Sequence, residues 1–176
     1  MNVQTAVKLP VFSLPQDQLL TVNVNDIPVM RDSLGPGIHF KPLLADPEGG
    51  VSAVLGIFAP GALVPAHYHT GAVHGYTLSG MWYYKEYRDQ PQTAGSYLFE
   101  PASSVHTFVV PETNTEDTVV LFIVYGGNIN FDEEGKFHSV LDAITLQNLI
   151  KMCSEKQGID QVRYLKGGSV HYSTDK

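Results

Sequence analysis

Short segments in which hydrophobic and polar residues alternate occupy most of the chain. They are rich in β-branched and aromatic residues and are separated by glycine, proline, asparagine and aspartate, as at residues 51–58, 81–87 and 118–125. Short strands at regular spacing, with turn residues between them, are typical of an all-β sandwich or barrel. The sequence therefore predicts about nine or ten strands that form one barrel over about residues 19–131, with its first strand at residues 19–24.

The pattern changes near residue 140, where apolar residues three and four positions apart replace the alternation. These residues are Leu146, Leu149, Ile150 and Cys153. Their spacing is that of one face of an amphipathic helix. Asp142 is suited to cap the start of this helix and Gly158 to end it. We expect a helix over about residues 140–157 that buries the side chain of Cys153.

The composition narrows the class of protein. The 176 residues predict a single domain, and the formal net charge of -7 comes without a cluster of cations, so we expect no nucleic-acid partner. No apolar run approaches the roughly 20 residues of a membrane helix, and no signal-peptide pattern opens the chain. A single cysteine allows no intrachain disulfide. These features predict a cytoplasmic protein without membrane contact. Residues 1–15, which contain two prolines, are expected to form an extended arm.

Four histidines are the candidate chemistry. His67, His69 and His74 lie within eight residues, and His106 follows in a later strand segment. Because side chains two apart on a strand share a face, His67 and His69 direct two imidazoles to one point. Imidazole nitrogen is a good ligand for first-row transition metals. The pair therefore predicts a metal site. The other histidines, His39, His138 and His171, have no partner at ligand spacing.

The spacing of these residues resembles the two motifs of the cupin superfamily. The matching positions are Gly61, His67, His69 and Gly80 in the first motif, and Gly95, Pro101 and His106 in the second. The resemblance covers roughly residues 38–127. It implies an all-β jelly-roll barrel with a short C-terminal helix, in which His67, His69 and His106 hold a metal ion.

The acidic ligand of the first cupin motif has no counterpart here. Its position falls on Val73 or, with one residue of slack, on His74, and neither is acidic. Two models follow. In one, the metal has three histidine ligands and Val73 occupies the carboxylate position. In the other, His74 is a fourth ligand. Because neighbouring residues of a regular strand face opposite sides, we prefer the three-histidine model.

Several further residues are candidates for roles beside the metal. Glu100, at the end of a strand segment before His106, is a candidate to orient a ligand imidazole or a metal-bound water, or to accept a proton from substrate. Alternation along the aromatic segments directs some side chains inward. The predicted pocket residues are Val73, Tyr76, Trp82 and Tyr84.

Within the cupins, residues 67–80 and 94–107 resemble the 2,4'-dihydroxyacetophenone dioxygenase family, which is similar to the anti-sigma-factor type of cupin. The resemblance implies a non-haem Fe(II) dioxygenase that uses O2 to cleave the C–C bond beside a carbonyl in a small aryl hydroxyketone or diketone. It also implies a homodimer or homotetramer. A three-histidine site also suits Zn, Ni, Co or Mn. A non-catalytic zinc sensor or ligand-binding module, and a metal-dependent isomerase or hydrolase, are the alternatives.

Overall fold

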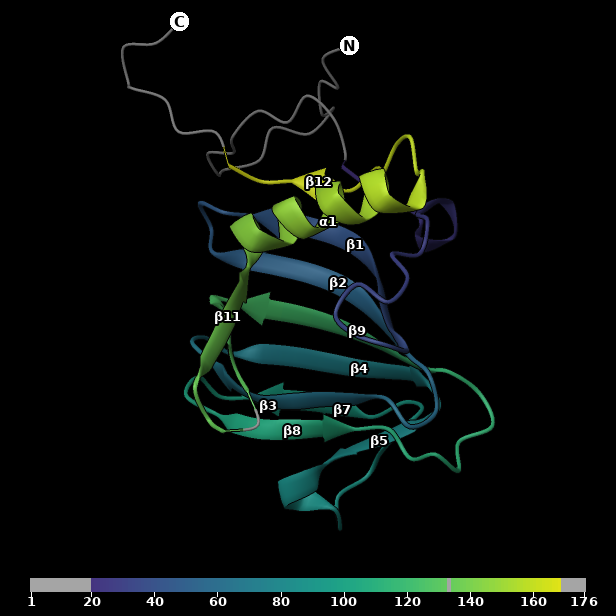
Figure 1. Ribbon diagram of the computed structural model, residues 1–176, viewed down its shortest axis with the longest axis vertical. Coiled ribbons are helices and arrows are strands. Elements are labelled where there is room, and N and C mark those ends of the chain that lie inside the picture. Colours follow the sequence, from purple (N-terminus) through teal and green to yellow (C-terminus); the bar gives the residue numbers. More distant parts are fainter. Residues whose placement is uncertain (1–19, 133, 169–176) are drawn as a thin grey trace, which may run out of the picture.

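Two six-stranded β-sheets face each other in a sandwich (Figure 1). The computed structural model describes residues 20–132 and 134–168. The first sheet has the order β12 (Leu165–Lys166), β1 (Ile38–Asp46), β2 (Val51–Phe58), β9 (Thr118–Tyr125), β4 (Val73–Ser79) and β7 (Tyr97–Glu100). The second has the order β11 (Phe137–Asp142), β10 (Gly127–Phe131), β3 (Leu63–His69), β8 (Val105–Val109), β5 (Met81–Tyr84) and β6 (Gln92–Thr93). This arrangement confirms the predicted all-β jelly roll.

Alternation along the strands decides what faces the space between the sheets. In β8, His106 and Phe108 face inward and are buried, whereas Val105 faces the opposite side and is exposed. In β4, Val73 and Thr77 are buried, whereas Tyr76 is exposed. A shift of one residue in register would turn each inward set to solvent, so burial of one face fixes the register.

An aromatic cluster fills part of the space between the two sheets. Trp82 is stacked on Phe108 with 4.5 Å between ring centroids, and Phe58 lies 4.5 Å from Phe108 on the other side. The indole Nε1 of Trp82 donates a hydrogen bond to Oγ1 of Thr77 at 3.0 Å. Because this bond satisfies the one polar atom of the indole, the ring is buried without leaving a polar atom that lacks a partner. Phe58 also lines the cavity described below, so the cluster forms part of the cavity wall.

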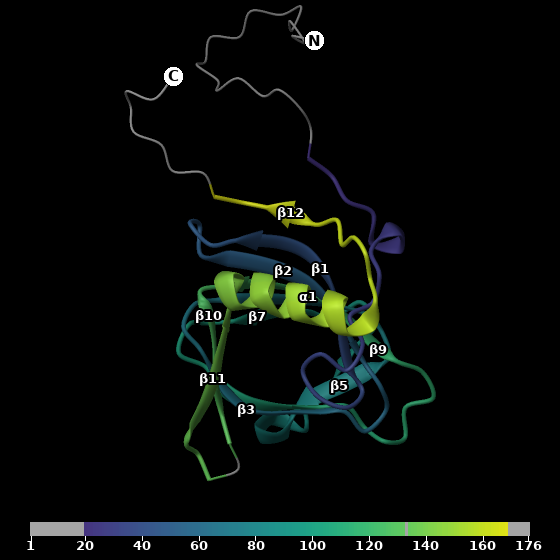
Figure 2. The same ribbon diagram turned by 45° about the horizontal axis from the view of Figure 1, so that its top comes forward.

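Helix α1 (Ala143–Gln157) packs between β1 and β11 (Figures 1 and 2). Asp142 and Thr145 form a capping box, and Gly158 ends the helix in the left-handed conformation. The apolar residues of α1, with Cys153 among them, are buried against Met30 and Phe40. The predicted helix is confirmed, but it begins at residue 143 rather than 140 because the preceding residues pair with β10 as strand β11.

The N-terminal part of the barrel differs from the prediction. Residues 20–23 form no strand, and a short 3-10 helix, η1 (Val24–Asp26), follows them. The side chain of Asn23 accepts a hydrogen bond from the backbone of Asn25, and this local bond competes with strand pairing. The sheets therefore begin at Ile38. A second 3-10 helix, η2 (Lys85–Tyr87), follows β5. The arm predicted over residues 1–15 lies outside the described residues. Within the described chain, no helix is long and apolar enough to cross a membrane.

Candidate metal centre

Three histidines from two neighbouring strands converge inside the sandwich. His67 and His69 come from β3, and His106 comes from β8, where it is the direct partner of His67 in the antiparallel pair. Their side chains are 5, 4 and 3% exposed. Ring centroids lie 4.9–5.0 Å apart, and one ligand atom from each ring lies within 4.8 Å of the other two. The sequence therefore brings three imidazoles together because β3 and β8 are neighbours.

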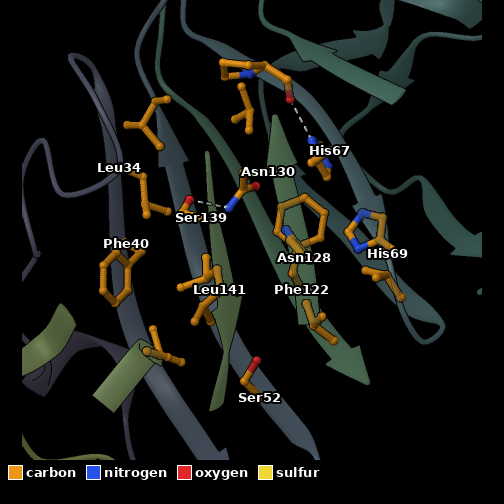
Figure 3. Close-up of a pocket in the computed structure, with 18 of the residues that line it drawn as sticks. Leu34, Phe40, Ser52, His67, His69, Phe122, Asn128, Asn130, Ser139 and Leu141 are labelled. Carbon is orange, nitrogen blue, oxygen red and sulfur yellow. Dashed lines mark hydrogen bonds between the residues drawn. The ribbon is translucent and has the colours of Figure 1, made fainter. Parts of the chain in front are cut away.

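The protonation of His67 suits metal binding. Its Nδ1 donates a hydrogen bond to the carbonyl oxygen of Pro65 at 2.8 Å, which leaves the Nε2 lone pair free (Figure 3). Burial lowers the pKa of His67 to about 4, although the bond to Pro65 opposes this shift. The imidazole is therefore neutral near pH 7. A neutral imidazole whose second nitrogen is held by a backbone carbonyl is the usual form of a metal ligand.

A carboxylate lies directly beside the histidines. Glu100, the last residue of β7, is 4% exposed, and its Oε2 lies 3.0 Å from Nε2 of His69 and 3.0 Å from Nε2 of His106. The hydroxyl of Tyr84 donates a hydrogen bond to the other oxygen, Oε1, and the Tyr84 ring is stacked on His106 at 3.7 Å. Burial raises the pKa of Glu100, but His106, His69 and Tyr84 outweigh burial and lower it to about 2. The group is therefore a carboxylate near pH 7.

These residues fit a divalent metal ion. Nε2 of His69 lies 3.1 Å from Nε2 of His106, so three atoms with lone pairs face one another at about 3 Å. Oε2 of Glu100 has no hydrogen-bond partner of good geometry within the described residues. Buried polar atoms without partners carry a desolvation penalty that a shared cation removes. The three-histidine group is consistent with a metal ion of the kind that imidazole ligands bind.

The metal centre opens into a cavity of about 430 Å³ (Figure 3). His67, His69 and Glu100 are among the residues that line it. The remaining wall is mainly apolar and includes Leu34, Phe40, Val54, Phe122, Val124 and Leu141. Polar groups on one side come from Asn128, Asn130 and Ser139. An apolar cavity of this size with a few polar groups suits a small organic ligand.

The structure separates the predicted pocket residues into two pairs. Val73 and Tyr84 line the cavity beside the metal centre. Trp82 and Tyr76 do not line it. Trp82 is fully buried in the aromatic cluster, and Tyr76 is 43% exposed on the outer face of β4. For Tyr76 the reason is alternation, since Val73 faces inward and a residue three positions later on a strand faces outward.

His74 lies on the outer face of β4. Its Nδ1 forms a hydrogen bond of 2.6 Å with the hydroxyl of Tyr97, and its ring lies 5.3 Å from that of Phe99. It is not part of the buried three-histidine group. Val73 is 1% exposed and faces the interior, so the position of the usual carboxylate is filled by an apolar side chain.

Other cavity residues were not recognised from the sequence. His39 and His138 both line the cavity although neither has a partner at ligand spacing. Asn128 and Asn130 are paired with His69 and His67 across β10 and β3, and the buried Oδ1 of Asn128 has no hydrogen-bond partner within the described chain. The signal in the sequence is that the two asparagines lie two residues apart, so their side chains share one face of a strand. His171 lies outside the described residues.

Residues 17–128 match the family of ChrR cupin-like domains. The chain therefore belongs to this family of the cupin superfamily, as its two-sheet sandwich and buried histidines indicate. No curated protein sequence is significantly similar to the chain.

Solved structures share the whole fold. A protein of unknown function with a cupin-like fold from Ralstonia eutropha JMP134 is 38% identical, with a TM-score of 0.84 over 92% of this chain and 100% of that chain. An RmlC-like cupin from the same organism is 28% identical, with a TM-score of 0.76 over 85% of this chain and 94% of that chain. An acetylacetone dioxygenase from Acinetobacter johnsonii is 15% identical, with a TM-score of 0.66 over 84% of this chain and 99% of that chain. At that identity, the last similarity is one of fold.

Proposed function

We propose that the protein is a non-haem iron dioxygenase that cleaves the C–C bond beside a carbonyl in a small hydroxyketone or diketone. The observation that carries this proposal is the buried group of three histidines, two of which, His67 and His69, line a mainly apolar cavity. An octahedral ion held by three histidines leaves coordination positions open for substrate, and a carboxylate beside them would still leave open positions.

The residues of the cavity would divide the work between holding the ion and binding the substrate. His67, His69 and His106 would hold the ion, which supplies Lewis acidity and redox chemistry toward oxygen when bound. The apolar wall binds the hydrocarbon part of the substrate and limits access of water. Glu100 is the one acidic residue among the described residues that line the cavity. Its carboxylate lies beside the imidazoles of His69 and His106.

The balanced reaction for a hydroxyketone is simple. The bond between the carbonyl carbon and the hydroxyl-bearing carbon breaks, and the two oxygen atoms of O2 enter the products. A ketone with a terminal hydroxymethyl group thus gives a carboxylic acid and formic acid, with no further reductant. The resemblance of residues 67–80 and 94–107 to 2,4'-dihydroxyacetophenone dioxygenases supports this substrate class. The acetylacetone dioxygenase with the same fold makes a diketone the second class for the assay.

Two measurements test the proposal. The metal content of the protein purified without added metal is determined, and O2 uptake is followed after anaerobic loading with Fe(II), using 2-hydroxyacetophenone and acetylacetone as probes. We expect uptake of one O2 per ketone with matching amounts of acid product. His106→Ala should abolish both iron binding and uptake, whereas His74→Ala, a histidine outside the cavity, should retain both. Tightly held zinc with no O2 uptake by the Fe(II)-loaded protein on either probe would show a non-catalytic metal cupin instead.

A further inference from the structure

We propose that Glu100 is a fourth protein ligand of the metal, and that it supplies from β7 the carboxylate that Val73 cannot supply from β4. The inference rests on the proposed function only in requiring that the three histidines hold a metal ion. It does not depend on the reaction that the site catalyses. It changes the predicted role of Glu100 from a group that orients a ligand to one that binds the metal itself.

The strand pairing places the two positions side by side. Val73 and Glu100 are direct partners in the antiparallel pair of β4 and β7. Residues opposite each other in such a pair face the same side of the sheet, with Cβ atoms about 4.5–5.5 Å apart. Both side chains line the cavity, and both are almost fully buried, with 1% exposure for Val73 and 4% for Glu100. A carboxylate on β7 therefore reaches the same part of the interior as one on β4.

The distances from Glu100 to two of the three histidines match those between neighbouring ligand atoms on a single ion, whereas the ligand atoms within 4.8 Å of one another are those of the histidines alone. Oε2 of Glu100 and the Nε2 atoms of His69 and His106 form a triangle with edges of 3.0, 3.0 and 3.1 Å. Ligand atoms bound at about 2.1 Å and at right angles to one another lie about 3.0 Å apart. A nitrogen that binds a metal carries no proton and cannot donate to the carboxylate. In the metal-bound site, contacts this short are repulsive unless the same cation attracts all three atoms.

The remaining contacts of Glu100 hold Oε2 in that position. The hydroxyl of Tyr84 donates to Oε1, so that oxygen is satisfied. Oε2 has no hydrogen bond of good geometry within the described residues. Three neutral imidazoles and one carboxylate form a donor set with a charge of −1, which partly neutralises a divalent ion in a buried site. The chain would thus keep the carboxylate of the cupin site while moving it to the neighbouring strand.

Anaerobic titration with Co(II) alone tests this role without any turnover. The variants are Glu100→Gln, which keeps the shape of the side chain but removes its charge, and the exchange Val73→Glu with Glu100→Val. The matched control is Glu86→Gln, because Glu86 accepts a hydrogen bond from Thr107 near His106 but does not line the cavity. Circular dichroism of the metal-free variants reports whether each one folds. Competition with a chelator gives the Co(II) affinity, and the visible d–d bands report the ligand set.

For Glu100→Gln we expect Co(II) binding to weaken by more than 100-fold, beyond the 10–100-fold typical of residues that only orient ligands, and the d–d bands to change. Glu86→Gln should alter neither. The exchange variant should bind Co(II) at least tenfold more tightly than Glu100→Gln does. If Glu100→Gln folds and its d–d bands match those of the wild type, Glu100 is not a ligand, whatever its affinity or activity. If Glu100→Gln loses O2 uptake but binds Co(II) as tightly as the wild type, the metal site is intact and only the ligand role of Glu100 is refuted. Co(II) binding without O2 uptake by the Fe(II) protein would instead refute the dioxygenase proposal.

Discussion

Among the described residues, the hydroxyl of Tyr84 is the one donor to Oε1 of Glu100, and we expect its removal to give a measurable loss of stability. Tyr84→Phe keeps the ring that is stacked on His106 and packed against Trp82, and deletes only the oxygen. A hydrogen bond to a charged acceptor contributes about 1.5–3 kcal/mol, and loss of the donor leaves a buried carboxylate oxygen without a partner. We therefore expect the free energy of unfolding of the metal-free protein to fall by about 2–3 kcal/mol at pH 7.

Urea unfolding of metal-free protein, followed by tryptophan fluorescence, measures this loss. The control is Tyr83→Phe on the same strand, because the hydroxyl of Tyr83 has no hydrogen bond within the described part of the chain, and it should change stability by less than about 0.5 kcal/mol. Repeating Tyr84→Phe in a Glu100→Gln background tests the role of charge. There the cost should fall to about 0.5–1.5 kcal/mol, the range for a neutral hydrogen bond. A cost for Tyr84→Phe below about 0.5 kcal/mol, or one that is unchanged in the Gln background, would refute the reasoning.

Three further predictions concern the helix, a tight turn and pH. Asp142→Ala removes the side-chain half of the capping box and should lower the free energy of unfolding by about 1 kcal/mol in urea; no loss would show that the cap does not contribute. Gly71→Ala should lower the melting temperature by several degrees, because a Cβ there would lie 2.2 Å from the backbone oxygen of Tyr125; an unchanged midpoint would contradict this geometry. In metal-free protein, stability should fall as pH drops from 6.5 to 4, because unfolded His67 takes up a proton in this range and the buried imidazole, with its pKa of about 4, does not. The full difference is about 3 kcal/mol, and His67→Gln should flatten this slope in urea unfolding measured from pH 7 to pH 4.

The sequence was sufficient for the local structure and for the histidine set. Alternation predicts strands because residues two apart share a face, and the same rule groups His67 with His69. The apolar spacing around Cys153 predicts α1 for the corresponding reason in a helix. The alternation also separates Val73 from His74, which the structure places on opposite sides of β4. These features depend on neighbours in the chain, so the sequence contains them directly.

Alternation alone could not distinguish the cavity from the core. Trp82 and Tyr84 lie two residues apart, face inward and belong to the same core cluster, yet of the two only Tyr84 lines the cavity. What separates them is depth within the sandwich, which depends on the side chains that the opposite sheet contributes. The same limit applies to Asn128, which lines the cavity because β10 pairs with β3 beside His69.

Glu100 illustrates both what its sequence position indicates and what only the tertiary structure decides. Its sequence position, six residues before His106, indicates a carboxylate near the metal centre but not its distance from the ligand atoms. The pairing of β7 with β4 decides that Glu100 lies opposite Val73, and the pairing of β3 with β8 brings His69 and His106 within 3.1 Å of each other. The sequence by itself determined which side chains share one face of a strand and which residue types are available to a metal. Only the tertiary structure decided which of them meet, because contacts between strands distant in the chain depend on sheet order and register, which no local pattern encodes.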